Sequence, residues 1–196
     1  MTDLVTGSDG LARCRWAAST PDYAVYHDEE WGRPLHGDDA LYERLTLEAF
    51  QSGLSWLTIL RKRPAFRLAF AGFRLQTVAG YGDPDVTRLM ADAGIVRNRA
   101  KIDAAIVNAR AALDLPDGLA ALLWSFAPVA RPSRPRSFAS VPAVTQESTA
   151  MAKALKKRGF RFVGPTTAYA LMQAAGMVDD HLDGCHVKPP AVAVMR

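Results

Sequence analysis

Both cysteines of the chain and two of its four histidines lie in two short stretches near opposite ends of the sequence. Cys14 and His27 form a C-x12-H pair, and His181 and Cys185 form an H-x3-C pair. Two thiolates and two imidazoles make a complete tetrahedral shell for zinc, with no position left for a reactive water molecule. The residue types therefore predict one structural zinc ion per chain, which joins the two ends.

The spacing alone leaves alternatives to this zinc site open. The cysteines could be buried thiols and the histidines solvated, because distant pairs lack the fixed register of a compact zinc finger. His186 could also take a ligand position in place of Cys185 or His181. A disulfide is the weaker interpretation, since a chain of this size does not need one and a reducing compartment opposes it.

A second group of residues is aromatic and lies beside the first metal pair. These rings could form a core seam, or the wall of a pocket that stacks on a flat ligand such as an extruded nucleobase. Glu48 favours the pocket, because it shares a helix face with Leu41 and Leu45, and a buried carboxylate needs an ionic partner or a cationic ligand. The aromatic residues are Trp16, Tyr23, Tyr26, Trp31 and Trp56.

Two further segments combine basic side chains with a predicted helix end. Residues 89–106 read as two helices joined at a glycine, similar to a helix-hairpin-helix that offers backbone amides to a phosphate. Residues 154–164 carry a basic run that could follow a phosphate backbone. Either segment could instead be a solvated face or a favourably charged helix end. The candidate DNA contacts are Gly94, Arg97, Arg99, Lys101, Lys156, Lys157 and Arg158.

The elements that position these residues are predicted to be almost entirely helical, because no stretch alternates apolar and polar residues as a half-buried strand does. The expected fold class is all-α, with residues 1–10 a disordered extension, 11–188 one domain and 189–196 a flexible tail. Start and stop signals predict helices at 38–52, 55–63, from Pro64 onward, 83–93, 97–113, 145–158 and 165–175.

Length and composition suit one compact, soluble domain. The chain has 196 residues, of which 49% are hydrophobic and 22% charged. A formal net charge of +4 permits a polyanionic partner without requiring one. The sequence shows neither a signal peptide nor an apolar run long enough to span a bilayer, so we expect a cytoplasmic protein with no membrane partner.

Six ordered blocks between Cys14 and Cys185 closely resemble the 3-methyladenine DNA glycosylase I family of the helix-hairpin-helix superfamily. They are RCRW (13–16), YAVYHDEEWG (23–32), LTLEAFQSGLSWLTIL (45–60), AGIVRNRAKI (93–102), ALKKRGFRFVGPTTAY (154–169) and DDHLDGC (179–185). The resemblance implies a helical glycosylase fold, and a structural zinc ion on Cys14, His27, His181 and Cys185. It also implies a base pocket of Trp16, Tyr23, Tyr26, Trp56 and Glu48. The sequence departs from the family after Cys185, where His186 and a proline pair replace further cysteines.

The resemblance implies a monofunctional enzyme that hydrolyses the N-glycosidic bond of 3-methyladenine in double-stranded DNA. We expect it to act as a monomer. The methylated base is cationic, so the faces of Tyr26 and Trp56 would attract it and Glu48 would accept from its exocyclic amine. The turn at 51–55 would enter the gap in the duplex, with Gly53 allowing close approach and Leu54 as an apolar wedge. Two other functions stay open: a zinc-containing DNA-binding module without catalysis, and a metal-dependent hydrolase.

Overall fold

Helices account for nearly all of the regular structure in residues 3–129 and 133–188, which the computed structural model describes. The prediction of a mainly helical fold is confirmed. No helix in these two ranges is long and apolar enough to cross a membrane. In chain order the elements are β1 (Leu4–Thr6), β2 (Ala12–Cys14), η1 (Arg15–Ser19), α1 (Pro21–Glu29), α2 (Asp38–Gln51), α3 (Trp56–Ala69), η2 (Ala71–Phe73), α4 (Leu75–Ala79), α5 (Asp83–Ala91), α6 (Arg99–Leu113), α7 (Gly118–Trp124), η3 (Phe138–Ser140), α8 (Gln146–Lys157) and α9 (Pro165–Ala174).

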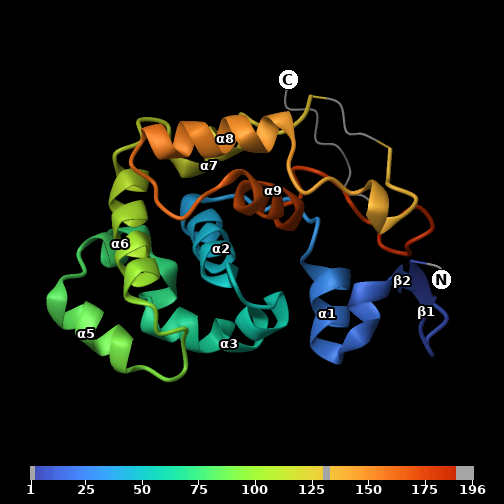
Figure 1. Cartoon of the computed structure of the whole chain (residues 1–196), viewed down its shortest axis with the longest axis horizontal. Coiled ribbons are helices and arrows are strands. Elements are labelled where there is room, and N and C mark those ends of the chain that lie inside the picture. Colours follow the sequence, from blue (N-terminus) through green and yellow to red (C-terminus); the bar gives the residue numbers. More distant parts are fainter. Residues whose placement is uncertain (1–2, 130–132, 189–196) are drawn as a thin grey trace.

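Helix α2 lies in the middle of the molecule and contacts α3, α6, α7 and α9 (Figure 1). Its buried residues therefore cover more than one face, and they include Leu41, Leu45, Leu47 and Phe50. A helix that is buried on several sides belongs to the core, so a charged side chain on it is enclosed by protein. Glu48 is enclosed in this way.

Several predicted helices begin and end close to their expected positions. Helix α8 follows Thr145, whose side chain accepts from the Ser148 amide in a capping box. Helix α6 begins at Arg99, two residues later than predicted, because the Asn98 side chain caps it by accepting from the Lys101 amide at 3.2 Å. Local capping signals therefore identified these helix starts well.

The predicted helix break at Pro64 is wrong, since α3 continues through this residue to Ala69. Proline lacks an N–H, so the helix forgoes one backbone hydrogen bond there. Ile59 and Leu60 before the proline and Phe66 after it are all buried in the core. Burial on both sides of Pro64 offsets the missing bond and keeps the two halves in one helix.

The predictions that residues 1–10 are disordered and that the chain has no strand are also wrong for the described residues. Strand β1 pairs antiparallel with β2, with Leu4 opposite Cys14. Asp3 also accepts a hydrogen bond from the Phe138 amide at 2.9 Å. Each strand has only three residues, too few for a periodic pattern to indicate. Residues 1–2 and the predicted tail at 189–196 lie outside the described residues.

The two ends of the described chain meet at one end of the molecule. Strands β1 and β2 lie beside α1 there, whereas α5 and α6 form the opposite end (Figure 1). The segment after α9 returns to the strands, where the His186 amide donates to the Ala12 carbonyl at 2.8 Å. This return brings residues near 181–185 next to residues near 14–27.

Candidate active site

A cavity of about 230 Å³ opens where α1, α2, α3 and α9 meet. The predicted aromatic residues and Glu48 are brought together here, which favours the pocket interpretation over a closed core seam. Helix α9 completes the wall with Ala170 and Gln173, which the sequence did not single out. The lining residues are Trp16, Tyr23, Tyr26, Trp31, Glu48, Gln51, Trp56, Ala170 and Gln173.

The aromatic rings form one connected set around the cavity. Tyr26 and Trp56 lie with ring centroids 5.5 Å apart at an interplanar angle of 45°. Trp16 meets Tyr23 edge-on at 5.5 Å, and it meets Trp31 edge-on at 5.2 Å. Such contacts hold each ring in place and leave electron-rich surface toward the cavity, which suits a flat, cationic ligand.

Glu48 reaches the cavity from the interior of α2 and is only 6% exposed. Burial raises the pKa of its carboxyl group to about 7, although the charge of Arg44 acts in the opposite direction. No described side chain or amide donates a hydrogen bond to this carboxyl group. A carboxylate held this way is available to a ligand that brings a donor or a positive charge.

Trp56 lines the same cavity and carries a second polar group without a partner. Its indole Nε1 is buried, and no described residue accepts a hydrogen bond from it. A buried N–H group without an acceptor costs free energy.

A buried ion network holds the tyrosine on the cavity wall. Arg44 donates from Nη1 to the Tyr26 hydroxyl at 2.8 Å, and its Nη2 lies 3.4 Å from Glu30. Arg63 binds both oxygens of Glu30. Burial alone would raise the pKa of Glu30, but Arg63, and next Arg44, lower it below its usual value. The network fixes Tyr26, and nothing in the sequence spacing pointed to Arg44.

The turn at 51–55 lies at the cavity, between α2 and α3. Leu54 is 42% exposed, and Gly53 has a φ of +84°, a left-handed conformation that favours glycine. Open space surrounds the position of a Gly53 Cβ atom, so nothing blocks an approaching chain. An exposed leucine at a tight turn has the form predicted for the wedge.

Lys101 does not have the role predicted for it. Its side chain is buried, and Nζ donates to the carbonyl oxygens of Phe50 at 2.9 Å and Ser52 at 2.6 Å. Desolvation lowers its pKa. Two of the three N–H donors on Nζ are engaged in this way, so Lys101 ties the end of α2 and the turn at 51–55 to α6.

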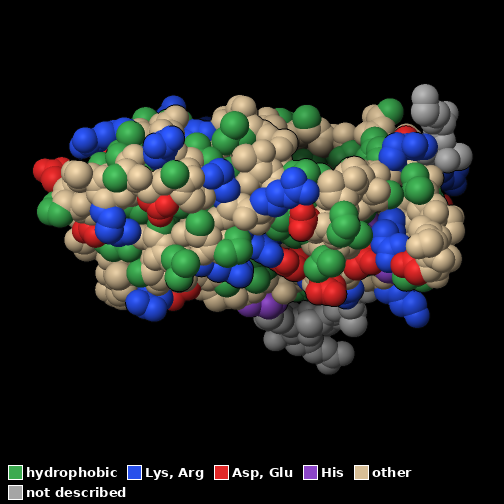
Figure 2. Space-filling model, turned by 90° about the horizontal axis from the view of Figure 1, so that it is seen from below, with side chains coloured by type: hydrophobic (Ala, Val, Ile, Leu, Met, Phe, Trp, Pro, Cys, Tyr) green, Lys and Arg blue, Asp and Glu red, His purple; other side chains and the backbone are tan. Residues whose placement is uncertain are grey.

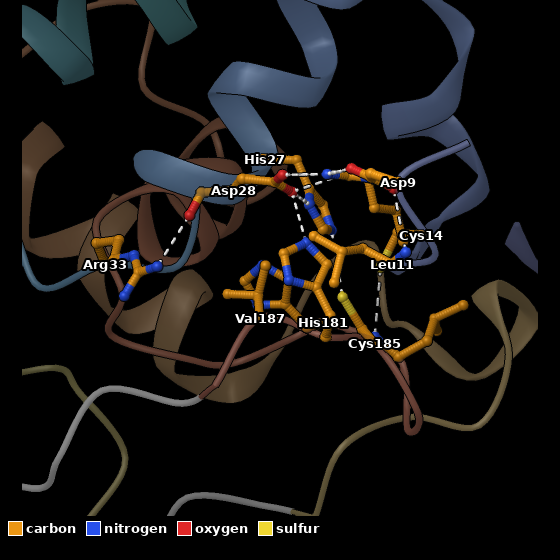
Figure 3. Close-up of polar contacts among 12 residues, drawn as sticks. Asp9, Leu11, Cys14, His27, Asp28, Arg33, His181, Cys185 and Val187 are labelled. Carbon is orange, nitrogen blue, oxygen red and sulfur yellow. Dashed lines mark hydrogen bonds and ion pairs between the residues drawn. The ribbon is translucent and has the colours of Figure 1, made fainter. Parts of the chain in front are cut away.

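The four predicted metal ligands meet at the junction of the chain ends, and we name them the Cys–His cluster (Figure 3). One ligand atom each from Cys14, His27 and Cys185 lies within 4.8 Å of the others. The His181 ring centroid is 4.9 Å from that of His27. His181 Nε2 is buried, and no described residue partners it. An orphaned nitrogen on the imidazole next to His27, whose own nitrogen lies within 4.8 Å of both sulfur atoms, fits a tetrahedral metal ion.

Each histidine of the cluster is oriented by a carboxylate. Asp28 lies 2.7 Å from His27 Nδ1, and Asp179 lies 2.8 Å from His181 Nδ1. Carboxylates in this position fix the imidazole and leave Nε2 for a metal ion. The sequence analysis missed both residues, although each stands within two positions of its histidine. Gly32 also supports His181, because a Cβ atom there would lie 2.7 Å from the His181 Cε1 atom.

The sulfur atoms of the cluster are prepared for metal binding. A hydrogen bond from the Cys14 thiol lowers the pKa of Cys185, and His27 adds to this effect. The thiolate, which is the form that binds metals, is therefore favoured at Cys185. His186 Nε2 lies 2.9 Å from the Asp28 carboxylate, and His186 forms a separate group with His27 and Asp28 whose ligand atoms lie within 4.8 Å of one another.

The basic segments occupy two helix junctions. Arg97 and Arg99 are exposed between α5 and α6, where Arg99 lies 3.5 Å from Asp103. The predicted run of Lys156, Lys157 and Arg158 is exposed at the end of α8. The second junction is attached to the C-terminal half of α6, because Asn108 exchanges two hydrogen bonds with the backbone of Arg161, which follows α8.

The two junctions differ in how their second helix begins. The Asn98 side chain accepts from one amide at the start of α6, that of Lys101, whereas Gly164 caps α9 without a side-chain hydrogen bond. Pro165 has no amide N–H, so the first turn of α9 can offer an anion no more than the amides of Thr166 and Thr167. On the face shown in Figure 2, Lys and Arg side chains are spread among acidic and hydrophobic ones and form no continuous patch.

Comparison with known proteins assigns the family. The methyladenine glycosylase family model matches residues 16–188. DNA-3-methyladenine glycosylase 1 of Escherichia coli K12 is 43% identical over 183 residues, which cover 91% of this chain and 98% of that protein. DNA-3-methyladenine glycosylase of Haemophilus influenzae is 41% identical over 182 residues, which cover 90% of this chain and 97% of that protein.

Solved structures agree with the sequence relatives. A crystal structure of 3-methyladenine DNA glycosylase I superposes with a TM-score of 0.86 at 44% identity, covering 90% of this chain and all of that one. A variant of the same kind of enzyme in complex with 3-methyladenine gives a TM-score of 0.85 at 35% identity, covering 90% and 97%. With a family model that matches most of its length and close relatives of the same length, the chain belongs to the methyladenine glycosylase family.

Proposed function

We propose that this protein hydrolyses the N-glycosidic bond of 3-methyladenine in alkylated double-stranded DNA, releasing the free base and leaving an abasic site. The observation that carries the proposal is the aromatic cavity with Glu48 inside it, in a chain of this family. The cavity is open to a base only when that base leaves the duplex, as base-excising enzymes require. Relatives with this activity by name match the chain over nearly its whole length.

The residues of the cavity can carry the chemistry. Methylation at N3 places a positive charge on the base and weakens its bond to the sugar, so the enzyme has a smaller barrier to lower than for a normal base. Tyr26 and Trp56 would stack on the cation, and Glu48 would accept from its exocyclic amine. Water would then capture the sugar cation. Since no lysine lines the cavity in the described residues, we expect no covalent intermediate and no strand cleavage.

We also propose that the Cys–His cluster binds one zinc ion with a structural role. Cys14, His27, His181 and Cys185 would hold it, and a bound zinc ion with four protein ligands supplies no activated water. Its contribution is to join β2 and α1 to the segment after α9. A zinc ion with four protein ligands has no open position for a reactive water molecule, and this argues against the metal-dependent hydrolase that the sequence left open.

The DNA surface would include the turn at 51–55 and the helix-hairpin-helix. We propose that the junction of α8 and α9 is the stronger phosphate site, because no side chain caps its second helix, and Lys156, Lys157 and Arg158 are exposed at the end of its first. Arg97 and Arg99 would add contacts at the junction of α5 and α6. One chain contains every residue of the cavity, so we propose a monomer that acts on cytoplasmic DNA.

The experiment that tests the function is base release from methylated duplex DNA, followed by chromatography. We expect free 3-methyladenine and an abasic site, with the strand intact until it is treated with alkali. Binding of methylated DNA without release of any base would instead support the non-catalytic DNA-binding module.

A further inference from the structure

Gln173 lines the cavity from α9, opposite the helices that carry the predicted base-binding residues. It is half-buried, and it is one of two glutamines on the cavity wall. Neither the spacing of the motifs nor the resemblance assigned it a role. A polar side chain on an aromatic wall contributes hydrogen bonds that decide which ligand fits.

The Gln173 amide is held in one orientation. Its Nε2 donates to Asp180 Oδ2 at 2.8 Å, and the Tyr169 hydroxyl donates to the same oxygen at 2.7 Å. A carboxylate oxygen accepts and does not donate, so the amide atom next to it must be the nitrogen. The opposite orientation would place two oxygen atoms in contact. The carbonyl oxygen Oε1 is left without a donor among the described residues.

The supporting residues are themselves well placed. Tyr169 precedes Gln173 by one helical turn on α9 and is buried. Asp180 belongs to the segment that returns from α9 toward the strands. Its neighbour Asp179 orients His181 of the Cys–His cluster and is bound by Arg134 at 2.9 Å. Two adjacent carboxylates thus support two different sites, and the rigid Asp179 contacts hold Asp180 in position.

We propose that Gln173 is a specificity-determining residue, which presents Oε1 to the exocyclic amine of the extruded base in an orientation set by Asp180 and Tyr169. The inference rests on the function proposed above. Glu48 and Gln173 would then both accept hydrogen bonds, so the cavity favours a base with an amine at that edge. Guanine carries a carbonyl oxygen there, and 3-methylguanine would set oxygen against oxygen. Both methylated bases are cationic, so their charge does not distinguish them. The hydrogen bonds to Glu48 and Gln173 would distinguish them instead.

The test compares release of 3-methyladenine and 3-methylguanine from the same methylated duplex DNA, as the ratio of their kcat/KM values. Gln173→Met removes the amide with little change in volume. We expect the ratio to fall roughly threefold to tenfold, the range for one lost hydrogen bond. Asp180→Ala frees the amide to rotate and should lower the ratio in the same direction. Gln76→Met, on an exposed face of α4, is the matched control and should leave the ratio unchanged.

Thermal unfolding and the ratio together separate the outcomes. An equal loss of activity on both bases in Gln173→Met, or an unchanged ratio, overturns the proposal, because a merely structural residue affects both substrates alike. If Gln173→Met does not fold, the same ratio is measured for Asp180→Ala. A lower ratio supports the proposal and an unchanged ratio overturns it. A wild-type protein that releases neither base contradicts the proposed function itself, whereas an altered ratio can be observed only if that function holds.

Discussion

Glu48 combines burial, an unpartnered carboxyl group and a place among aromatic rings. In Glu48→Gln the side chain keeps its shape and one acceptor oxygen but loses the negative charge that complements a cationic base. We expect excision to fall by about 10- to 1000-fold, the range for one lost electrostatic contribution, while the fold is kept. The loss stays partial because the scissile bond is already weak. Single-turnover excision and the unfolding temperature check this prediction.

An alternative role for Glu48 would give a different result. If the carboxylate only balances the charge of Arg44, Glu48→Gln should lower the unfolding temperature while the folded fraction keeps wild-type activity. Tyr26→Leu and Trp56→Leu are useful comparisons. Each removes one stacking face and should lower the excision rate less than Glu48→Gln does.

The pH dependence of activity follows from the same residue. Burial raises the pKa of Glu48 to about 7, so the group is protonated below that pH and ionised above it. If the ionised form binds the cationic base, kcat/KM for excision should rise as the pH increases through about 7, since this parameter reports the free enzyme. In Glu48→Gln, this rise of kcat/KM with pH should be absent. The same rise in the variant would show that another group titrates.

The contribution of Glu48 to stability should fall as the pH rises, whereas its contribution to activity should rise. The unfolded chain ionises Glu48 near its ordinary pKa of 4.5, whereas the folded protein keeps it neutral up to about 7. This residue therefore favours the folded state most at low pH, and its contribution is lost progressively as the pH rises from about 4.5 to about 7. Urea unfolding of wild type and Glu48→Gln across that interval should diverge accordingly.

At the scale of elements, Lys101 connects α6 to the turn that carries Leu54. Lys101→Met keeps the aliphatic stem but leaves two carbonyl oxygens without their donor. We expect excision from duplex DNA to fall about tenfold, while binding of free 3-methyladenine to the cavity is unchanged, because the turn and not the cavity is affected. Lys153→Met, at an exposed position on α8, is the matched control. Equal losses in both assays would show that Lys101 supports the cavity instead.

The junction of α8 and α9 allows a test of DNA binding. If Lys156, Lys157 and Arg158 contact phosphates, each substitution to alanine should weaken binding to any duplex sequence. It should also reduce the slope of log K against log salt concentration by about 0.9 per lost contact. Titrations at several salt concentrations measure this slope. Unchanged slopes would leave the three residues as a solvated helix end.

At the scale of the whole molecule, the Cys–His cluster joins segments that are far apart in the sequence. Cys14→Ser and His181→Ala should each lose bound zinc and lower the unfolding temperature, because a closed site loses metal when one ligand is removed. His36→Ala is the matched histidine control, since His36 is exposed and stacks on Trp124 at 4.8 Å, away from the cluster. Metal analysis and calorimetry check the outcome. Purified wild-type protein without metal but with undiminished stability would contradict it.

The mainly helical fold and most helix starts follow from local chemistry, and so were accessible from the sequence. Thr145 and Asn98 cap their helices through bonds to residues three positions away. Such bonds depend on neighbouring residues only, so a sequence contains the information directly. The same holds for the ordered blocks that carry the resemblance, and for the donor types of the Cys–His cluster.

Tertiary structure alone decided the features that depend on distant contacts. Pro64 stays inside α3 because the core packs on both sides of it, and β1 forms because β2 is there to pair with it. Lys101 is drawn inward by carbonyl oxygens about fifty positions away in the chain, which no local pattern indicates. Gln173 faces the cavity only because α9 lies against α2. Residue types and spacing determine which chemistry is available, whereas packing determines which side chains reach the same cavity.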